Sequence, residues 1–309
     1  MGNGDTLLAP ARRRFLRDGI ALGSLAMMPC AGAAPALATR TIPADRRPLQ
    51  VVGLGTWQTF DVGTDAATRA RLGQVLTRFA ELCGSVVDSS PMYGSAEAVL
   101  GDLAAAASLR ERLFLATKVW TRGRAAGVTQ MEQSLRLLRS PRIELMQVHN
   151  LLDWQAHLPV LRALKAEGRI RYLGITHYAA SAYGEVETVL RTERLDFLQI
   201  NYSLLEQESA QRLLPLAAES GVAVIVNRPF AEGALFGRVK GTPLPAEAAN
   251  HGCKSWAQVF LRWILANPAV TCAIPASGKP EHLEENMAAG LLPLPGPGEQ
   301  KALAAIAGF

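Results

Sequence analysis

Short runs of apolar residues alternate with amphipathic segments over most of this 309-residue chain. Most of the runs are rich in Val, Ile and Leu, which is typical of parallel strands that are buried on both faces. Eight runs are expected to form strands: Leu49–Leu54, Ser85–Val87, Leu113–Thr117, Ile143–Val148, Ile170–Ile175, Phe197–Ile200, Val222–Val226 and Thr271–Ile274.

The segments between these runs have the pattern of amphipathic helices. The clearest is Trp256–Leu265, which gathers its large apolar side chains on one face and has Ser255 in place to cap its start. Eight strands alternating with helices predict an α/β fold, a (β/α)8 TIM barrel built as a single domain. A doubly wound open sheet is the alternative that strand counting leaves open. It loses support because Gln58 stands where a GxGxxG fingerprint starting at Gly53 needs its third glycine.

Polar residues follow the apolar runs with regularity. In a barrel these positions gather on one rim, at the C-terminal ends of the strands, where barrel enzymes have their active sites. One polar residue after a strand would need no explanation, but six successive strand ends favour a functional site. The residues are Asp88, Lys118, His149, Thr176 with His177, Asn201, and Asn227 with Arg228.

The N-terminal segment is expected to be an export signal. Residues Ala11–Arg17 resemble a twin-arginine motif, an apolar stretch follows to Met28, and Ala36-Leu37-Ala38 resembles a cleavage site. We therefore expect residues 1–38 to be a twin-arginine signal peptide, read by an export translocase, and residues 39–309 to be the barrel in the periplasm. The apolar stretch is shorter than the roughly 20 residues of a membrane span, so no stable membrane insertion is expected after cleavage.

The net charge of +5 changes this picture little. Residues 1–38, with four arginines and two aspartates, carry +2 of it, which leaves a mildly basic barrel. No basic run is interleaved with aromatic residues, so nucleic acid is not an expected partner. No Cys/His spacing is typical of a metal site, and His157 and His251 are interpreted as surface polar residues.

Four sequence motifs are similar to those of the aldo-keto reductase superfamily. Val86–Glu97 holds Asp88 and Tyr93 at the spacing of the family signature, and Ala116–Trp120 resembles the family's lysine motif. Met146–Asn150 resembles its histidine motif, and Gly53–Trp57 its first strand and turn. The similarity extends from about Val51 to Asn286, nearly all of the chain after the expected signal. It implies a TIM barrel that transfers hydride between a nicotinamide cofactor and an aldehyde or ketone.

Carbonyl reduction needs hydride on carbon and a proton on oxygen, and the residue types suit that need. A free tyrosine has a pKa near ~10, and a neighbouring ammonium lowers it. Tyr93 is therefore expected to be the general acid, Lys118 the ammonium that lowers its pKa, and Asp88 the carboxylate that holds Lys118. His149 would position and polarise the carbonyl oxygen. The resemblance implies the same four roles.

The resemblance also implies a cofactor site at two places on the rim. The segment Ile274–Asn286 corresponds to the family's adenosine 2′-phosphate and adenine site, and Pro280 suits a helix start that attracts phosphate. Ala276 and His282 stand where the family commonly has lysine and arginine, but Lys279 favours NADPH, with NADH as the alternative. The residues expected to bind cofactor are Thr56, Trp57, Thr176, His177, Gln199, Asn227, Arg228, Pro229, Phe230, Ser277, Lys279, His282, Glu285 and Asn286.

Trp57 and Trp120 come directly after strand ends and are expected to line an apolar substrate pocket, with core packing as the alternative. The segment Arg228–Lys254 is long for a βα connection, and we interpret it as a lid over the pyrophosphate or as a mobile loop. Two other functions stay open: a cofactor-bound regulatory or auxiliary redox-sensing barrel with little turnover, and an aldolase or isomerase that uses Lys118 as a Schiff base. The natural substrate and the oligomeric state do not follow from the sequence.

Overall fold

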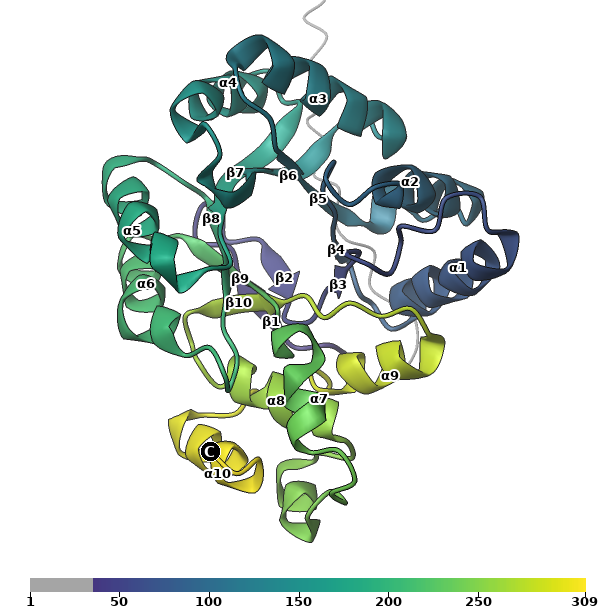
Figure 1. Ribbon diagram of the computed structural model, residues 1–309, viewed down its shortest axis with the longest axis vertical. Helices are drawn as coiled ribbons and strands as arrows, with labels where there is room; N and C mark the ends of the chain where they lie inside the picture. Colours follow the sequence, from purple (N-terminus) through teal and green to yellow (C-terminus); the bar gives the residue numbers. More distant parts are fainter. Residues whose placement is uncertain (1–35) are drawn as a thin grey trace, which may run out of the picture.

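The computed structural model describes residues 36–309, so the expected signal motif lies outside the described residues. Eight parallel strands form one sheet in the order in which they occur along the chain, with helices around the outside (Figure 1). The strands are β3 (Leu54–Gly55), β4 (Val86–Asp88), β5 (Phe114–Val119), β6 (Ile143–Val148), β7 (Ile170–Thr176), β8 (Phe197–Asn201), β9 (Ala223–Asn227) and β10 (Val270–Ala273).

The first and last strands meet and close the sheet into a barrel. Parallel bridges join Val52 to Ala273 and Gly55 to Ala276, and the amide of Ala273 donates to the carbonyl of Val51 at 2.9 Å. A doubly wound sheet would have two open edges here. The predicted (β/α)8 barrel is therefore confirmed.

Helices connect the strands and cover the barrel. They are α1 (Ala66–Glu81), α2 (Ala96–Ala106), α3 (Arg124–Leu137), α4 (Trp154–Ala166), α5 (Tyr183–Thr192), α6 (Glu208–Glu219), α7 (Ala234–Arg238), α8 (Trp256–Leu265), α9 (Pro280–Ala288) and α10 (Pro297–Ile306). Helix α8 has the predicted bounds, and the Ser255 hydroxyl accepts from the amide of Gln258 as a cap. Asp65 caps α1 in the same way, because its carboxylate accepts from the amides of Ala67 and Thr68.

Short 3-10 turns complete the connections: η1 (Arg110–Arg112), η2 (His149–Leu151), η3 (Ala180–Ala182), η4 (Ala231–Gly233) and η5 (Ala246–His251). Together with α7, η4 and η5 lie in the long β9–α8 connection. Phe230 and Phe236, with ring centroids 4.8 Å apart, pack there against Phe260 of α8. Residues 239–245, between α7 and η5, are irregular and mostly exposed, so both interpretations of the connection, a lid or a mobile loop, stay predictions.

The barrel interior changes from apolar to polar along its axis. Side chains alternate along each strand, so every second residue points inward. The interior toward the N-terminal ends of the strands is an apolar cluster that includes Phe114, Leu145 and Tyr172, all buried. The next inward positions carry Lys118 on β5 and Gln147 on β6, which are paired neighbours in the sheet register. The polar residues at the C-terminal ends of the strands therefore lie directly above a packed apolar layer.

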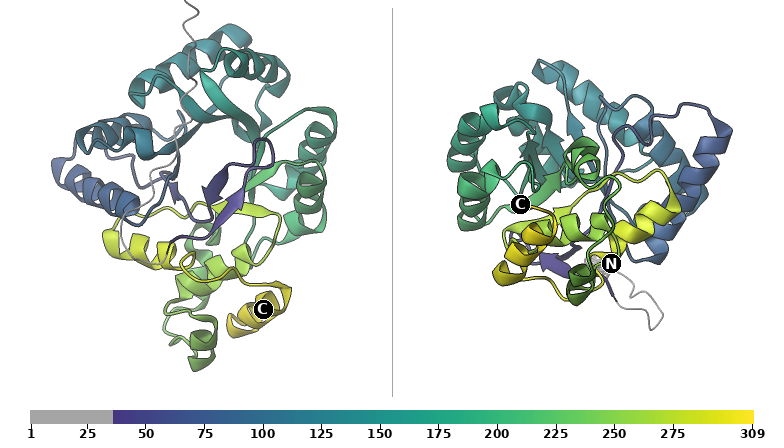
Figure 2. Two further views of the ribbon diagram at one scale, coloured as in Figure 1. Left: turned by 180° about the vertical axis from the view of Figure 1, so that it is seen from behind. Right: turned by 60° about the horizontal axis from the view of Figure 1, so that its bottom comes forward.

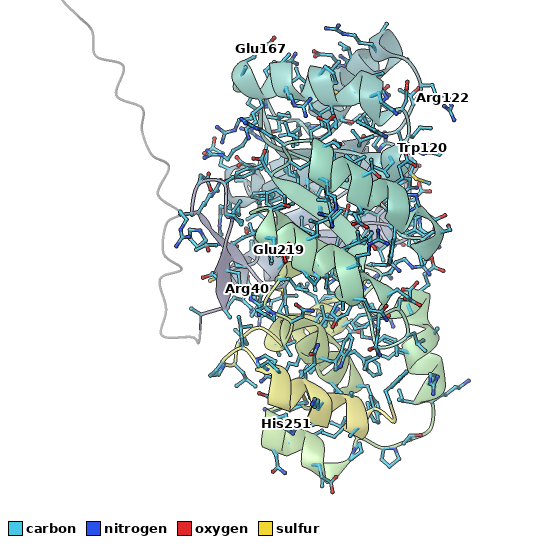
Figure 3. The ribbon with its side chains drawn as sticks, turned by 90° about the vertical axis from the view of Figure 1, so that its left-hand side faces the viewer. Arg40, Trp120, Arg122, Glu167, Glu219 and His251 are labelled. Atoms are coloured by element: carbon cyan, nitrogen blue, oxygen red, sulfur yellow. The ribbon has the colours of Figure 1, made fainter. Side chains whose placement is uncertain are left out.

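A two-stranded hairpin, β1 (Thr39–Thr41) and β2 (Pro48–Gln50), covers the N-terminal end of the barrel (Figure 2). The Arg40 guanidinium donates to the carbonyls of Leu265 at 2.6 Å and Asn267 at 2.7 Å. In Figure 3, Arg40 lies on one side of the molecule and Trp120 on the opposite side. The hairpin end is therefore remote from the strand ends that carry the polar residues.

One sequence interpretation is wrong in this part of the molecule. His157 of α4 is not a surface residue: it is 0% exposed, and its Nε2 is hydrogen-bonded to the carbonyl of Thr121 at 2.8 Å. No helix in residues 36–309 is long and apolar enough to cross a membrane. In the same range, no three His, Cys, Asp or Glu side chains come together as metal ligands.

Candidate active site

A buried ion pair occupies the centre of the polar end of the barrel. Asp88 ends β4 and Lys118 lies on β5, and the Lys118 Nζ is 2.6 Å from the Asp88 Oδ2 and 2.7 Å from the carbonyl oxygen of Ser89. Lys118 is 1% exposed. Burial acts to lower the pKa of Lys118, but the Asp88 and Tyr93 groups outweigh it and raise the pKa. Lys118 is therefore an ammonium.

Tyr93 lies next to this ammonium. It follows β4 in the turn before α2, and its ring centroid is 5.0 Å from the Lys118 Nζ. Burial raises the pKa of Tyr93, and the Lys118 charge and hydrogen bond lower it by a smaller amount, so the net direction is upward. The expected lowering by Lys118 is present but smaller than the effect of burial, which the sequence did not reveal. Tyr93 therefore keeps its proton, as a general acid must.

His149 faces Tyr93 across the mouth of the barrel. The two ring centroids are 5.9 Å apart with an edge-on arrangement, and the Trp120 ring lies 6.3 Å from His149. Burial lowers the pKa of His149 to about 2, and the charges of Lys118 and His177 act in the same direction. The imidazole is therefore neutral and can donate one hydrogen bond and accept another.

The sequence reasoning missed three residues, two that contact these groups and one that contacts the loop after β10. Gln147 donates to Asp88 Oδ1 at 3.4 Å, Ser90 Oγ lies 3.0 Å from His149 Nδ1, and Arg71 donates to the carbonyl of Gly278 at 3.1 Å. Strand alternation could have revealed Gln147 and Ser90, each two residues from a predicted site residue. Nothing in the sequence relates Arg71 to Gly278.

Gln199 and Thr56, which were expected to bind cofactor, both contact the ion-pair region. Gln199 donates to Asp88 Oδ2 at 3.1 Å, and the Thr56 hydroxyl is 3.0 Å from the carbonyl oxygen of Asp88. Asp88 thus has Lys118, Gln147 and Gln199 as donors around its carboxylate. The geometry gives Gln199 and Thr56 a supporting contact with the site in addition to any contact with cofactor.

Thr176, His177 and Asn227 lie together at the ends of β7 and β9. The Thr176 hydroxyl accepts from the amide of Asn150 at 3.1 Å, and Asn227 Nδ2 donates to the carbonyl of His177 at 3.2 Å. The Asn227 Oδ1 is buried and has no hydrogen-bond partner among residues 36–309. A buried acceptor without a donor suits an amide donor from a ligand.

Arg228, Pro229 and Phe230 continue from β9. Arg228 is 3.0 Å from the Glu232 carboxylate, 3.4 Å from the Glu206 carboxylate and 5.4 Å from the centre of the Tyr178 ring. Phe230 packs into the aromatic cluster with Phe236, and Pro229, between Arg228 and Phe230, is buried. These contacts tie the start of the β9–α8 connection to the ends of β7 and β8.

The segment after β10 forms the second group of predicted cofactor residues. Ser277 is buried, and its hydroxyl accepts from Asn286 Nδ2 at 2.9 Å, which ties the loop to the second turn of α9. Lys279 precedes Pro280 at the start of α9, where no side chain caps the free amides. His282 and Glu285 are exposed on the same helix. Free amides, a lysine and the positive end of a helix fit a phosphate group.

Trp57 and Trp120 are 38% and 41% exposed, so neither is a core residue. Gln130 of α3 holds the Trp120 backbone through two hydrogen bonds, at 2.6 Å and 3.2 Å. The exposed Trp120 ring, 6.3 Å from His149, suits an apolar part of a ligand, and the exposure of both indoles makes core packing the weaker of the two interpretations.

Comparisons with known proteins agree with this geometry. Residues 51–297 match the aldo/keto reductase family. Methylglyoxal reductase YeaE of Escherichia coli is 29% identical over 78% of this chain and 85% of its own length. The NADH-specific methylglyoxal reductase of the same organism is 26% identical over 78% of this chain and 90% of its own length.

Solved structures give the same result. The crystal structure of an aldo/keto reductase from Klebsiella pneumoniae in complex with NADP and acetate has a TM-score of 0.71 and 26% identity. It covers 87% of this chain and 96% of that one. A family match over most of the chain, on a closed barrel with the polar site at the expected rim, leaves one assignment. The chain belongs to the aldo/keto reductase family.

Proposed function

We propose that the protein reduces an aldehyde or ketone to an alcohol with NADPH, and that Tyr93 gives the proton. The observation that carries the proposal is the Tyr93 ring beside the buried Lys118 ammonium, with neutral His149 facing it. NADPH, when bound, supplies the hydride to the carbonyl carbon. Structures of relatives that hold NADP and NADPH support this choice of cofactor.

The residues of the chain supply the rest of the reaction. The Tyr93 hydroxyl transfers its proton to the carbonyl oxygen, and the Lys118 ammonium stabilises the phenolate that remains. Asp88 keeps Lys118 charged and in place, and is itself held by Gln147 and Gln199. His149 donates a hydrogen bond to the carbonyl oxygen. Exposed Trp57 and Trp120 contact the apolar part of the substrate.

In the cofactor site, we assign the phosphate end to Ser277, Lys279 and the free amides of α9. Arg71, exposed on α1 and bonded to the loop at Gly278, adds a positive charge there. Asn227, whose buried Oδ1 has no partner among residues 36–309, is assigned to the nicotinamide carboxamide. A Schiff-base function is disfavoured because the Lys118 nitrogen is protonated and has no free lone pair for attack on a carbonyl.

The test is the oxidation of NADPH and NADH, followed at 340 nm, with a panel of aldehydes, ketones and quinones that includes methylglyoxal. We expect Tyr93→Phe to lower turnover at least about a hundredfold, because the proton donor is lost. The matched control is Tyr172→Phe, which removes a tyrosine hydroxyl at the opposite end of the barrel, where it donates to Asp45. Turnover in Tyr172→Phe should stay within about twofold.

Full activity of Tyr93→Phe would overturn the role of Tyr93. If neither wild type nor variant turned over any substrate but both bound NADPH tightly, the auxiliary or redox-sensing function would replace the reductase. Wild-type turnover in Tyr172→Phe separates a loss in Tyr93→Phe from a general effect on the fold, and NADPH binding by wild type shows that an inactive protein is folded.

We further propose that the protein is exported to the periplasm in a folded state, with NADPH bound. Support comes from the sequence alone, in the arginines of Ala11–Arg17 and the small-residue pattern before Thr39. Cell fractionation should find wild type in the periplasm and the double variant Arg12→Lys, Arg13→Lys in the cytoplasm, with Arg17→Lys as the control. Wild-type protein in the cytoplasm, or periplasmic protein without cofactor, would contradict the respective parts of this proposal.

A further inference from the structure

Ser90 lies beside the predicted histidine although the proposed reaction gives it no role. It follows Asp88 by two positions at the end of β4, so strand alternation places both side chains on the same side. Ser90 is 0% exposed, and its Oγ is 3.0 Å from His149 Nδ1. A buried hydroxyl at this distance from a ring nitrogen is a hydrogen bond, and its direction decides where the histidine carries its proton.

The other contacts of the hydroxyl determine that direction. The amide of Met92 donates to Ser90 Oγ at 3.4 Å, so this contact uses a lone pair of the oxygen and not its hydrogen. Within residues 36–309, His149 Nδ1 is the one acceptor in contact with the hydroxyl. If Nδ1 carried the proton instead, the buried O–H would have no acceptor, which costs about 1–3 kcal/mol. The hydroxyl therefore donates to Nδ1.

We propose that Ser90 is a positioning residue that keeps the proton of His149 on Nε2 and so makes Nε2 the hydrogen-bond donor to the substrate carbonyl oxygen. The proposal rests on the proposed carbonyl reduction. With Nδ1 occupied by Ser90, Nε2 is the nitrogen left for a ligand. The ring lies between Tyr93 and Trp120, and its neutral state at ordinary pH leaves a choice of two tautomers for Ser90 to decide.

The consequence is that two groups, Tyr93 and His149, donate hydrogen bonds to the substrate carbonyl oxygen. Tyr93 gives its proton to the carbonyl oxygen, and His149 Nε2–H stabilises the negative charge that develops there before the proton arrives. A ring already in the correct tautomer needs no rearrangement during the reaction. Without Ser90, part of the population would place the proton on Nδ1 and present a lone pair to the substrate oxygen, which repels it.

The direct test is the tautomer of His149, observed by long-range proton–nitrogen NMR of ¹⁵N-histidine-labelled protein near neutral pH. Wild type should show Nδ1 with the chemical shift of an unprotonated nitrogen and Nε2 with that of a protonated one. Ser90→Ala should move both nitrogens toward intermediate shifts. The His149 signals are assigned by their loss in His149→Gln. This readout needs neither substrate nor turnover, so it stands or fails independently of the proposed function.

The kinetic test uses Ser85→Ala as the matched control. Ser85 is a buried serine directly before β4, at the opposite end of this strand from Ser90, and its hydroxyl bonds to Gln50. We expect Ser90→Ala to lower kcat about tenfold with the Kd of NADPH unchanged, and Ser85→Ala to leave both within about twofold. A protonated Nδ1 in wild type, or Ser90→Ala with the wild-type nitrogen shifts, would overturn the proposal. A fall in kcat without a change in the nitrogen shifts would also overturn it.

Discussion

At the scale of single residues, burial and neighbouring charge have opposite effects on the pKa values of Lys118 and Tyr93. Lys118 loses water at the barrel centre but gains Asp88 at 2.6 Å, and the ion pair outweighs the loss. Tyr93 gains the neighbouring ammonium, yet burial is the larger effect on its pKa. His149 has no carboxylate partner, so burial and the Lys118 charge both favour its neutral form. The result is one cation between two neutral donors.

The neutral state of His149 predicts a loss of stability in acid. Its pKa is about 2 in the folded protein against 6.5 as the ordinary value, so below pH 6.5 the unfolded chain binds a proton that the folded protein does not. Stability from this residue is therefore complete above pH 6.5 and falls as the pH drops toward 2. Between pH 7 and pH 5 the loss is about 2 kcal/mol, because the slope approaches 1.36 kcal/mol per pH unit below pH 6.5.

His149→Gln removes the titrating group and should remove that loss. Urea unfolding at pH 7 and pH 5 gives the free energy of unfolding of both proteins. The fall between the two pH values should be about 2 kcal/mol smaller in the variant. Equal falls in wild type and variant would mean that His149 takes up its proton in the folded state near pH 6, contrary to the environment described above.

At the scale of elements, the sequence pattern predicted most of the barrel strands but not the hairpin that covers the N-terminal end of the barrel. The run Ile143–Val148 is β6 residue for residue: polar residues flank it, and its own Glu144 and Gln147 do not interrupt the strand. The run Leu49–Leu54 divides between the hairpin strand β2 and the barrel strand β3. The break covers residues 51–53 and includes Gly53, where a Cβ atom would lie 2.9 Å from the Val86 side chain and carbonyl. A hydrophobic pattern contains no information on such a close approach.

The same reasoning separates the predictable part of the site from the rest. Asp88, Lys118 and His149 follow consecutive parallel strands, so the fold alone brings them to one rim, as the sequence analysis expected. The contacts of Gln147 with Asp88 and of Ser90 with His149 depend on which side chains at a strand end point inward. Arg71 reaches Gly278 because α1 packs beside α9, a contact between the two ends of the chain that no local pattern encodes. Long-range helix packing thus limits prediction of the cofactor end more than of the catalytic end.

At the scale of the whole molecule, the assigned cofactor site joins elements from both halves of the barrel. Asn227 lies at the end of β9, Lys279 at the start of α9, and Arg71 on α1 contacts the loop between β10 and α9. A ligand that binds all of them favours the folded over the unfolded state. Cofactor binding should therefore raise the stability of the entire barrel and not only of one loop.

This linkage yields a test of cofactor choice that requires no substrate. NADPH at a hundred times its Kd should stabilise the fold by about 2.7 kcal/mol, which raises Tm by roughly 5 °C for a domain of this size. If Lys279 binds the 2′-phosphate, Lys279→Ala should weaken NADPH about tenfold and so reduce the shift at the same concentration to about half. NADH, which has no 2′-phosphate, should give the same shift in both proteins.

The matched control is Lys301→Ala, which removes an exposed lysine from α10. It should leave both cofactor shifts at their wild-type values, because α10 contributes none of the residues assigned to the cofactor. Equal losses with NADPH and NADH in Lys279→Ala would mean that the lysine supports the loop rather than the phosphate. In that case Arg71, which donates to the carbonyl of Gly278 in the same loop, would be the cation assigned to the 2′-phosphate, since Ala276 is uncharged.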